Sequence, residues 1–235
     1  MPIILAIETS SELASCALLS GGAVIARESS SVRTHSQSIL PMVQELLAQA
    51  GVALSACDAI AFGAGPGSFT GVRTACGIAQ GLAFGADLPV VPLVTLEAMA
   101  LACRERTGAA DILVVLDARM GEVYWAQYRY ADGWQVVSAP ALCAPDAVAP
   151  LPADSLAACG NGFTEYAAAF AGRPFAGGAL ADIVPHAREL AQLAALAFAR
   201  GEALPAAQAQ PLYLRNKVAY TSSERLAINA AKAAA

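Results

Sequence analysis

Apolar and polar positions along the chain predict an α/β protein. Its first third reads as three strands, with Gly21-Gly22 as a two-residue turn, followed by alternating helices and strands. Ser38 is expected to cap the first helix, which places Pro41 in the first turn, where its missing N–H costs nothing. The expected strands are residues 3–8, 14–20, 23–28, 58–63 and 89–93, and the expected helices are residues 39–50, 71–84 and 96–106.

The second half repeats this plan in a reduced form, which predicts an internal duplication of two βββαβα units. The expected strands here are residues 112–116, 123–130, 134–137 and 156–159, and the expected helices are residues 163–170 and 186–200. We therefore expect an N-terminal lobe over residues 1–108, a truncated C-terminal lobe over 109–219, and a flexible tail over 220–235.

Composition favours a soluble cytoplasmic protein with no membrane segment. The hydrophobic fraction is 57%, but much of it is alanine, and no charge-free run reaches the roughly 18 residues that span a bilayer. The opening MPIILAIETS has no basic region, so no signal peptide is expected. The six cysteines form no CxxC pair and lie among apolar neighbours, which predicts buried reduced thiols.

The net charge of -5 argues against a nucleic-acid-binding protein that acts alone. Neutralising phosphates needs clustered lysine and arginine, whereas this chain has two lysines and no basic run. Contact with RNA would have to be shared with a partner.

A glycine-rich turn joins an apolar strand to a helix in the segment AFGAGPGSFTGVR, residues 61–73. Such a turn commonly makes an anion cradle from unpaired backbone N–H groups and the helix dipole. It is no Walker loop, because Val72 and Arg73 follow the last glycine, and it lacks the spacing of the dinucleotide fingerprint and of a nucleophile elbow. Two interpretations remain open: a relic of nucleotide binding, or an interface.

A nucleotide site, if one exists, would combine this loop with the end of the first strand. The family resemblance given below implies an acidic residue at this place, where this chain has Glu8-Thr9-Ser10. The same three residues also suit an ordinary turn. The candidate nucleotide-binding residues are Glu8, Thr9, Ser10, Gly65, Gly67, Ser68 and Arg73.

The helix after the loop carries Gly77, Gly81 and Gly85 at four-residue spacing. Each interior glycine costs a helix about 1 kcal/mol, so a close approach by another backbone is expected, either from the chain's own sheet or from another molecule. In the preceding helix, Leu40 and Met42 lie off the apolar stripe and are expected to be exposed.

Two groups of charged residues, one in the middle of the chain and one near its end, each allow two interpretations. Asp117, Arg119 and Glu122 are expected to form an internal ion pair that shapes a turn rather than a catalytic site. Arg215 and Lys217 are candidates for a contact with a partner or, as the family resemblance given below implies, with tRNA; solvated charge is the alternative.

Five blocks of the sequence resemble the TsaB (YeaZ) family, which takes part in making threonylcarbamoyladenosine on tRNA. They are ILAIETSS, RTHSQSILPMVQELL, GAGPGSFTGVR, VTLEAMA with DARMGEVY, and PLYLRNKVA, and the resemblance runs from residue 3 to residue 219. It implies the actin, sugar-kinase and heat-shock-chaperone fold, which is ribonuclease H-like. It also implies that two helices form a bundle with the same helices of TsaD or of a second copy. The matching interface positions are His35, Ile39, Met42, Val43, Leu46, Leu47, Val72, Gly77, Ile78 and Gly81.

The related TsaD binds a metal through an HxxxH motif, but here the position four after His35 is Ile39. One imidazole is too few ligands for a metal, so His35 is expected to cap or hydrogen bond at the helix start. We expect no metal, no catalytic residue and no required cofactor, with ATP or ADP at a partner interface at most.

The leading hypothesis is a non-catalytic scaffold that binds TsaD-like and TsaE-like proteins, reaches tRNA only through that complex, and is a homodimer in isolation. The alternative is a weak nucleotide-binding enzyme that uses Glu8 and the glycine loop. A peptidase is disfavoured, because no Ser-His-Asp order or HExxH motif is visible.

Overall fold

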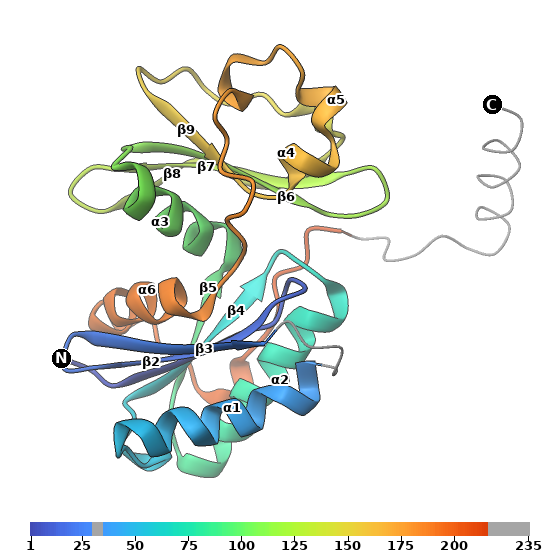
Figure 1. Cartoon of the computed structure of the whole chain (residues 1–235). Helices are drawn as coiled ribbons and strands as arrows, with labels where there is room; N and C mark the ends of the chain where they lie inside the picture. Colours follow the sequence, from blue (N-terminus) through green and yellow to red (C-terminus); the bar gives the residue numbers. More distant parts are fainter. Residues whose placement is uncertain (30–34, 216–235) are drawn as a thin grey trace, which may run out of the picture.

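The structure, a computed structural model, describes residues 1–29 and 35–215 as two lobes, one above the other (Figure 1). The first lobe contains β1 (Ile4–Glu8), β2 (Ala14–Ser20), β3 (Ala23–Ser29), α1 (His35–Ala50), β4 (Ala59–Gly65), α2 (Phe69–Ala86) and β5 (Val90–Val94). The next helix, α3 (Thr95–Thr107), packs with the strands of the second lobe (Figure 1). The remaining elements are β6 (Asp111–Asp117), β7 (Val123–Tyr130), β8 (Trp134–Cys143), β9 (Leu156–Cys159), α4 (Gly162–Glu165), α5 (Ala167–Phe170) and α6 (Ala187–Ala199). Short 3₁₀ turns lie at Leu54–Ala56, Pro145–Ala147, Pro174–Ala176 and Ala206–Gln208.

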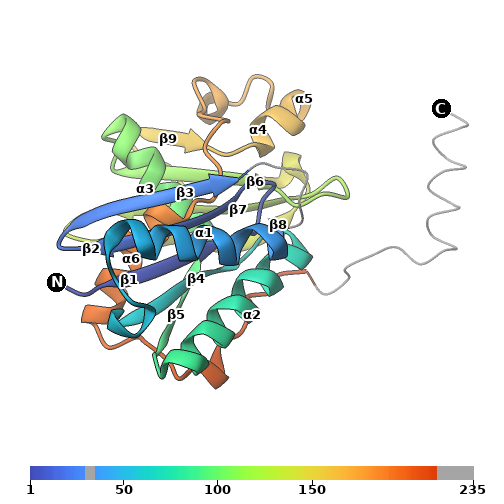
Figure 2. The same ribbon diagram turned by 60° about the horizontal axis from the view of Figure 1, so that its bottom comes forward.

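The first sheet has the strand order β3-β2-β1-β4-β5. β1 pairs antiparallel with β2 and parallel with β4, and every residue of β1 and β4 is buried. Helices α1 and α2 cover one face of this sheet, and α6 covers the other (Figures 1 and 2). Because both faces are covered, the strands read as continuous apolar runs rather than as alternating ones.

The second sheet has the order β8-β7-β6-β9, with β6 antiparallel to β7 and parallel to β9. This order repeats the first four positions of the first sheet. A 3₁₀ turn over Pro145–Ala147 stands where α1 stands in the first lobe. The fold is the expected α/β arrangement of two tandem lobes of the ribonuclease H-like class, the second of them truncated.

Two predicted helices differ from those observed. Among the described residues α1 begins at His35, so Ser38 is not its cap, and Pro41 lies in the second turn. The Ser38 hydroxyl donates instead to the His35 carbonyl at 3.2 Å. The helix expected over residues 163–170 is two short helices, α4 and α5, which meet at Tyr166. Apolar spacing identifies the buried face of a helix better than its ends.

Helix α6 comes from the second half of the sequence but packs on the sheet of the first lobe. Its buried residues, from Ala187 to Ala197, join a cluster with Ile4 and Ala6 of β1. The Ser15 hydroxyl of β2 accepts a hydrogen bond from the Ala187 N–H at 2.9 Å. The division of the chain at residue 108 stays a prediction; α6 ties its two halves together.

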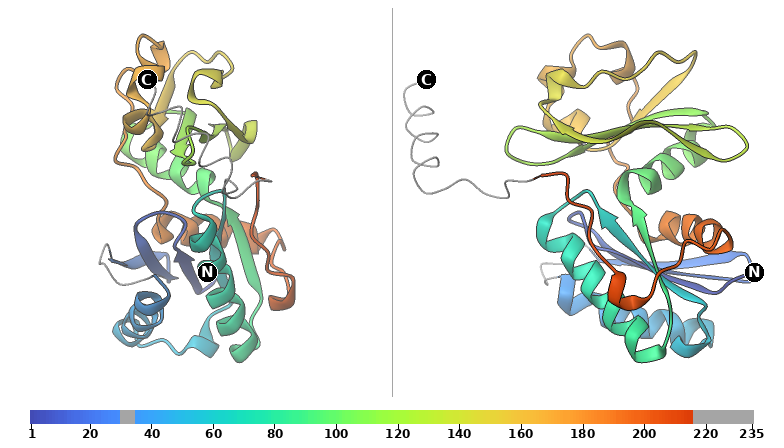
Figure 3. Two further views of the ribbon diagram at one scale, coloured as in Figure 1. Left: turned by 90° about the vertical axis from the view of Figure 1, so that its right-hand side faces the viewer. Right: turned by 180° about the vertical axis from the view of Figure 1, so that it is seen from behind.

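The segment over residues 203–215, which we call the C-terminal strap, also returns to the first lobe. Leu204 bridges to Val90 of β5, and the Gln80 side chain of α2 donates to the Ala206 carbonyl at 3.1 Å. Further on, the Leu212 N–H donates to the Ala64 carbonyl at 2.7 Å. Figure 3 shows, in its right-hand view, the strap running beside α2 toward the level between the lobes.

The helices and the cysteines bear on two expectations drawn from composition. None of the helices in residues 1–29 and 35–215 is long and apolar enough to cross a membrane. All six cysteines are free thiols, and five of them are buried; Cys143 is half-buried.

Burial of Glu189 at the start of α6 predicts a pH-dependent stability. Burial raises the pKa of this carboxyl to about 7, with Glu105 adding to the rise and Arg188 opposing it. Below the unfolded value of 4.5 both states hold the proton, and as pH rises to about 7 the folded state alone retains it. The free energy of unfolding should therefore fall with rising pH by up to about 3 kcal/mol more in the wild type than in Glu189→Gln.

Urea denaturation of both proteins at pH 4.5 and pH 8 measures this difference. His186, whose Nδ1 lies 3.8 Å from the Glu189 carboxylate, is present in both, so its own titration is largely shared. Equal pH dependence in the two proteins would contradict the assignment.

Candidate functional site

The glycine loop packs directly against the turn that follows β1. A Cβ added to Gly63 would lie on the Glu8 carboxylate, one at Gly71 would overlap the Thr9 carbonyl, and one at Gly67 would lie 2.6 Å from the Ser10 Cβ. Three glycines are thus required because another part of the chain occupies the space of their side chains.

Hydrogen bonds fix this contact. The Thr9 hydroxyl donates to the Gly71 carbonyl at 2.6 Å, and the Ser68 N–H donates to the Ser10 carbonyl at 2.7 Å. Ser68 caps α2, since its hydroxyl accepts from the Gly71 N–H at 3.4 Å. The N–H groups of Ser68 and Gly71, two donors that could cradle a phosphate, are therefore bonded within the chain. Nucleotide binding by Gly65, Gly67 and Ser68 stays a prediction that this geometry does not favour.

Glu8 lies in the interior rather than at a metal site. Its Oε1 accepts from the Ser10 N–H at 2.5 Å, whereas Oε2 has no partner in the described part of the chain. Burial raises the pKa of Glu8, which favours the neutral acid over a metal-binding carboxylate. Within residues 1–29 and 35–215, no group of three or more His, Cys, Asp or Glu side chains is placed to hold a metal ion.

A cleft of about 360 Å³ opens between the two lobes. It lies where the β1–β2 turn of the first lobe faces the β6–β7 turn of the second, and the C-terminal strap closes one side. Its polar lining includes Ser10, Ser11, Ser68, Asp117, Arg119 and Asn161.

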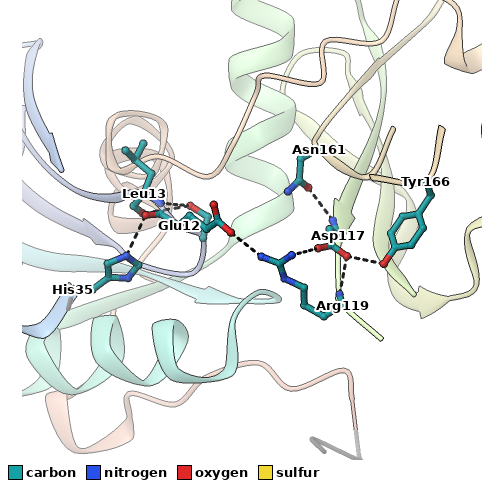
Figure 4. Close-up of polar contacts among 8 residues, drawn as sticks. Glu12, Leu13, His35, Asp117, Arg119, Asn161 and Tyr166 are labelled. Carbon is teal, nitrogen blue, oxygen red and sulfur yellow. Dashed lines mark hydrogen bonds and ion pairs between the residues drawn. The ribbon is translucent and has the colours of Figure 1, made fainter. Parts of the chain in front are cut away.

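An ion-pair network crosses the mouth of this cleft (Figure 4). Arg119 contacts Glu12 of the first lobe at 2.7 Å and Asp117 of its own lobe at 3.2 Å. The buried Asp117 carboxylate also accepts from the Tyr166 hydroxyl at 2.8 Å, and the Asn161 side chain accepts from the Asp117 N–H. The expected internal ion pair at this turn is confirmed. No local pattern in the sequence indicates Tyr166 or Glu12, because both contacts join residues far apart in the chain.

Arg215 anchors the strap to the same turn. Its guanidinium pairs with Glu122 at 2.7 Å and donates to the carbonyls of Ala118 and Arg119. Only 12% of its side chain is exposed, so it is an internal anchor and not a solvated charge; a contact of Arg215 with a partner or tRNA stays a prediction that this burial does not favour. Lys217 lies outside the described residues.

His35 turns inward at the start of α1, as Figure 4 shows. Its two ring nitrogens lie 3.3 Å from the Thr9 carbonyl and 3.2 Å from the Glu12 carbonyl. The expected hydrogen-bonding role is confirmed.

Much of the expected interface is core. Ile39, Val43, Leu46 and Val72 are buried within the first lobe. Met42 is only 9% exposed, so the expectation that it lies on the surface is wrong: α1 is rotated so that Met42 joins the stripe facing the sheet. A partner cannot reach these side chains without unfolding the lobe.

What a partner can reach is a second set of residues on α1 and α2, which lie side by side on the outer face of the first sheet (Figure 2). The chain leaves them exposed or half-exposed: Leu40, Leu47, Gly77, Ile78, Gly81 and Phe84. Nothing lies within 4 Å of a Cβ added to Gly77, Gly81 or Gly85, so the chain's own sheet does not need these glycines. Phe84, at 82% exposure, escaped the sequence analysis, although its spacing from Gly77 and Gly81 places it on the same face.

Arg73 does not line the cleft. Its guanidinium carbon lies 3.3 Å from the centre of the Phe69 ring and 5.0 Å from that of Tyr213 on the strap. This cation–π stack holds the arginine at the N-terminal end of the exposed face of α2.

The fold and the cleft define a two-lobed protein of the actin and sugar-kinase class whose cleft side chains bind one another. Comparison of the sequence with known proteins identifies the family. A family model described as TsaD, tRNA N6-adenosine threonylcarbamoyltransferase, matches residues 22–233. Two curated relatives, each named tRNA threonylcarbamoyladenosine biosynthesis protein TsaB, are 40% identical. That of Haemophilus influenzae aligns over 92% of this chain and 95% of its own, and that of Escherichia coli over 92% and 96%.

Solved structures agree with this. A Pseudomonas aeruginosa structure described as YeaZ has a TM-score of 0.83 and 43% identity, covering 91% of this chain and all of its own. Another from the same organism, described as similar to the peptidase YeaZ, has a TM-score of 0.85 and 43% identity, covering 92% of this chain and all of its own. The chain belongs to the TsaB (YeaZ) family.

The contact between Gly71 and Thr9 can be tested by adding one methyl group. Gly71→Ala should lower the free energy of unfolding by about 3 kcal/mol, because its Cβ has no room beside the Thr9 carbonyl. Gly77→Ala, in the same helix but facing open space, should raise it by about 1 kcal/mol. Chemical denaturation measures both, and similar effects at the two positions would contradict the packing described.

The contacts through which Arg215 anchors the strap lead to a second prediction. Arg215→Ala should destabilise the protein by about 2 kcal/mol, because Glu122 and two carbonyls lose their partner. Arg119→Ala should cost less than about 1 kcal/mol, since the Arg119 side chain is 67% exposed. Denaturant midpoints distinguish the two; an equal loss would mean that the Arg119 pair, and not the strap, holds the turn.

Proposed function

We propose that the chain is a non-catalytic partner subunit. It binds and stabilises a TsaD-like protein in the assembly that adds a threonylcarbamoyl group to the adenosine next to the tRNA anticodon. The observation that carries the proposal is the exposed face of α1 and α2, where Gly77, Gly81 and Phe84 have no use within the described chain.

The energetic cost of this face supports an external role. Interior glycines cost α2 about 1 kcal/mol each, and an aromatic ring left in water forgoes about 2 kcal/mol of burial. Small residues let a second helix approach closely, and an exposed aromatic ring is typical of the centre of an interface. Both costs are offset once a partner covers the face.

Catalysis is assigned to the partner. His35 is bonded to two carbonyls and has Ile39 in place of a second ligand. Arg119, Asp117 and Glu12 satisfy one another across the cleft. We therefore prefer the scaffold to the alternative of a weak kinase-like enzyme, in which Glu8 would need to be ionised and open to solvent.

Membership of the TsaB family also suggests the other members of the assembly. We infer that a TsaE-like ATPase joins the complex, that tRNA is reached only through it, and that the isolated chain pairs with a second copy. ATP or ADP, where it takes part, is assigned to the partner interface rather than to the glycine loop.

A charge on the exposed face tests the proposal. Gly81→Asp should fold, because nothing surrounds its Cβ, and should weaken binding to a TsaD-like protein by tenfold or more through an unpaired buried carboxylate. Val136→Asp, on an exposed side chain of the second lobe, is the matched control and should bind normally.

Co-purification and titration calorimetry with the purified partner measure both. Unchanged binding by Gly81→Asp would remove this face from the interface. ATP hydrolysis by the isolated chain that is lost in Glu8→Gln would favour the enzyme instead.

A further inference from the structure

Two of the buried cysteines lie against each other in the second lobe. Cys103 belongs to α3 and Cys159 ends β9, and both are part of the apolar cluster that these two elements share. Neither side chain is exposed to solvent. A single buried thiol is inert, whereas two thiols in contact can form a bond to each other.

Helical geometry places the Cys103 sulfur over the turn of α3 that Cys159 contacts. The Cys159 thiol donates to the Met99 carbonyl at 3.7 Å. Met99 precedes Cys103 by about one helical turn, and a helical side chain lies over the turn before its own Cα. The residue after Cys159 is equally close, since a Cβ added to Gly160 would lie 3.1 Å from the Met99 Cε. The end of β9 therefore packs directly on the turn from Met99 to Cys103.

The two sulfurs also share a hydrogen bond, which the Cys159 thiol donates to Cys103. Cys159 has one proton to donate, so it serves the Met99 carbonyl while Cys103 is neutral and the Cys103 sulfur once that is a thiolate. This hydrogen bond lowers the pKa of Cys103 although burial opposes it, whereas burial and the same contact raise the pKa of Cys159. Cys103 is therefore the better nucleophile of the two.

The other four cysteines lack this activation. Burial raises the pKa of the thiols of Cys16, Cys57, Cys76 and Cys143. They lie in or beside β2, β4, α2 and β8, away from the contact of α3 with β9. An oxidant that reaches the interior should therefore react first at Cys103.

We propose that Cys103 and Cys159 are a peroxide-sensitive dithiol. The Cys103 thiolate attacks hydrogen peroxide, so that an S–O bond forms and the O–O bond breaks; the hydroxide that leaves takes a proton and becomes water. The Cys159 thiol then attacks the sulfenic acid, so that the S–S bond forms, the S–O bond breaks and a second water leaves. Two thiols and one peroxide thus give one disulfide and two waters, and a small thiol reverses the change.

The enclosure of the pair selects a small oxidant. Bulky disulfides cannot reach sulfurs that are buried on every side. However, β9 is a four-residue strand at the edge of the second sheet, and short edge elements open locally more readily than the centre of a fold. Hydrogen peroxide, which is hardly larger than water, can enter during such an opening.

The disulfide would act on one wall of the cleft between the lobes. Asn161, two residues after Cys159, accepts a hydrogen bond from the Asp117 N–H at 2.9 Å. Helix α3 connects β5 of the first lobe to β6 of the second. A bond from Cys103 to Cys159 would therefore fix the helix that joins the lobes to the turn that holds Asp117.

Intact-mass spectrometry of the full chain after mild treatment with hydrogen peroxide tests the pair. The wild type should lose about 2 Da, and dithiothreitol should restore the mass. Cys159→Ala should instead gain about 16 or 32 Da, because the oxidised Cys103 has no second thiol to meet, and Cys103→Ala should show neither change. Cys76→Ala and Cys143→Ala each remove a thiol outside the pair; these matched controls should lose about 2 Da, as the wild type does.

Two measurements on the wild type do not depend on any variant folding. Peptide mapping without reductant should recover the segments of Cys103 and Cys159 linked to each other. The thermal midpoint of the oxidised chain should lie about 5 °C above that of the reduced chain, because the cross-link restricts the unfolded state. Circular dichroism verifies that each variant folds.

Three results would overturn the inference. They are a wild type that keeps its mass at peroxide concentrations that oxidise free cysteine, a disulfide that maps to any other two cysteines or still forms in Cys103→Ala, and a midpoint that is unchanged or lower after oxidation.

Discussion

The approach of the glycine loop to the turn after β1 is the constraint on which the rest of the structure depends. With no side chain at Gly63 or Gly71, the loop closes on Glu8 and Thr9, and the hydroxyls of Thr9 and Ser68 secure it. This contact sets where α2 begins and how it lies on the sheet. It also places the strap, whose Leu212 bonds to Ala64 just before the loop. A strand, glycine loop and helix of this kind often bind phosphate, whereas here the loop packs against the turn after β1 of the same chain.

The cleft and the exposed face of α2 therefore differ in whether their side chains find partners within the chain. In the cleft, Arg119 and Arg215 are paired with carboxylates of the same chain. On α2, by contrast, a stacked arginine, open glycines and an exposed phenylalanine have no counterpart within the described chain. Polar groups satisfied inside and apolar groups left outside are typical of a subunit that works by docking.

The sequence predicted the strands, the duplication and the unusual status of the glycine loop, because these follow from local periodicity. It could not distinguish Gly71 from Gly77, since one faces Thr9 and the other solvent, and only the fold decides which. Met42 was assigned to the surface for a similar reason: a small rotation of α1 moves it into the core. The contacts of Arg215 and α6 span more than 90 residues, and no local pattern encodes them.

The proposed use of one face of α2 for both a second copy and a different protein has a consequence for supply. The two complexes would exclude each other, so chain in excess of its partner would be held as pairs. By mass action, the concentration of unpaired chain then rises only as the square root of the total. A fourfold rise in synthesis would merely double the amount free to enter the larger assembly, which buffers that assembly against fluctuations in this subunit.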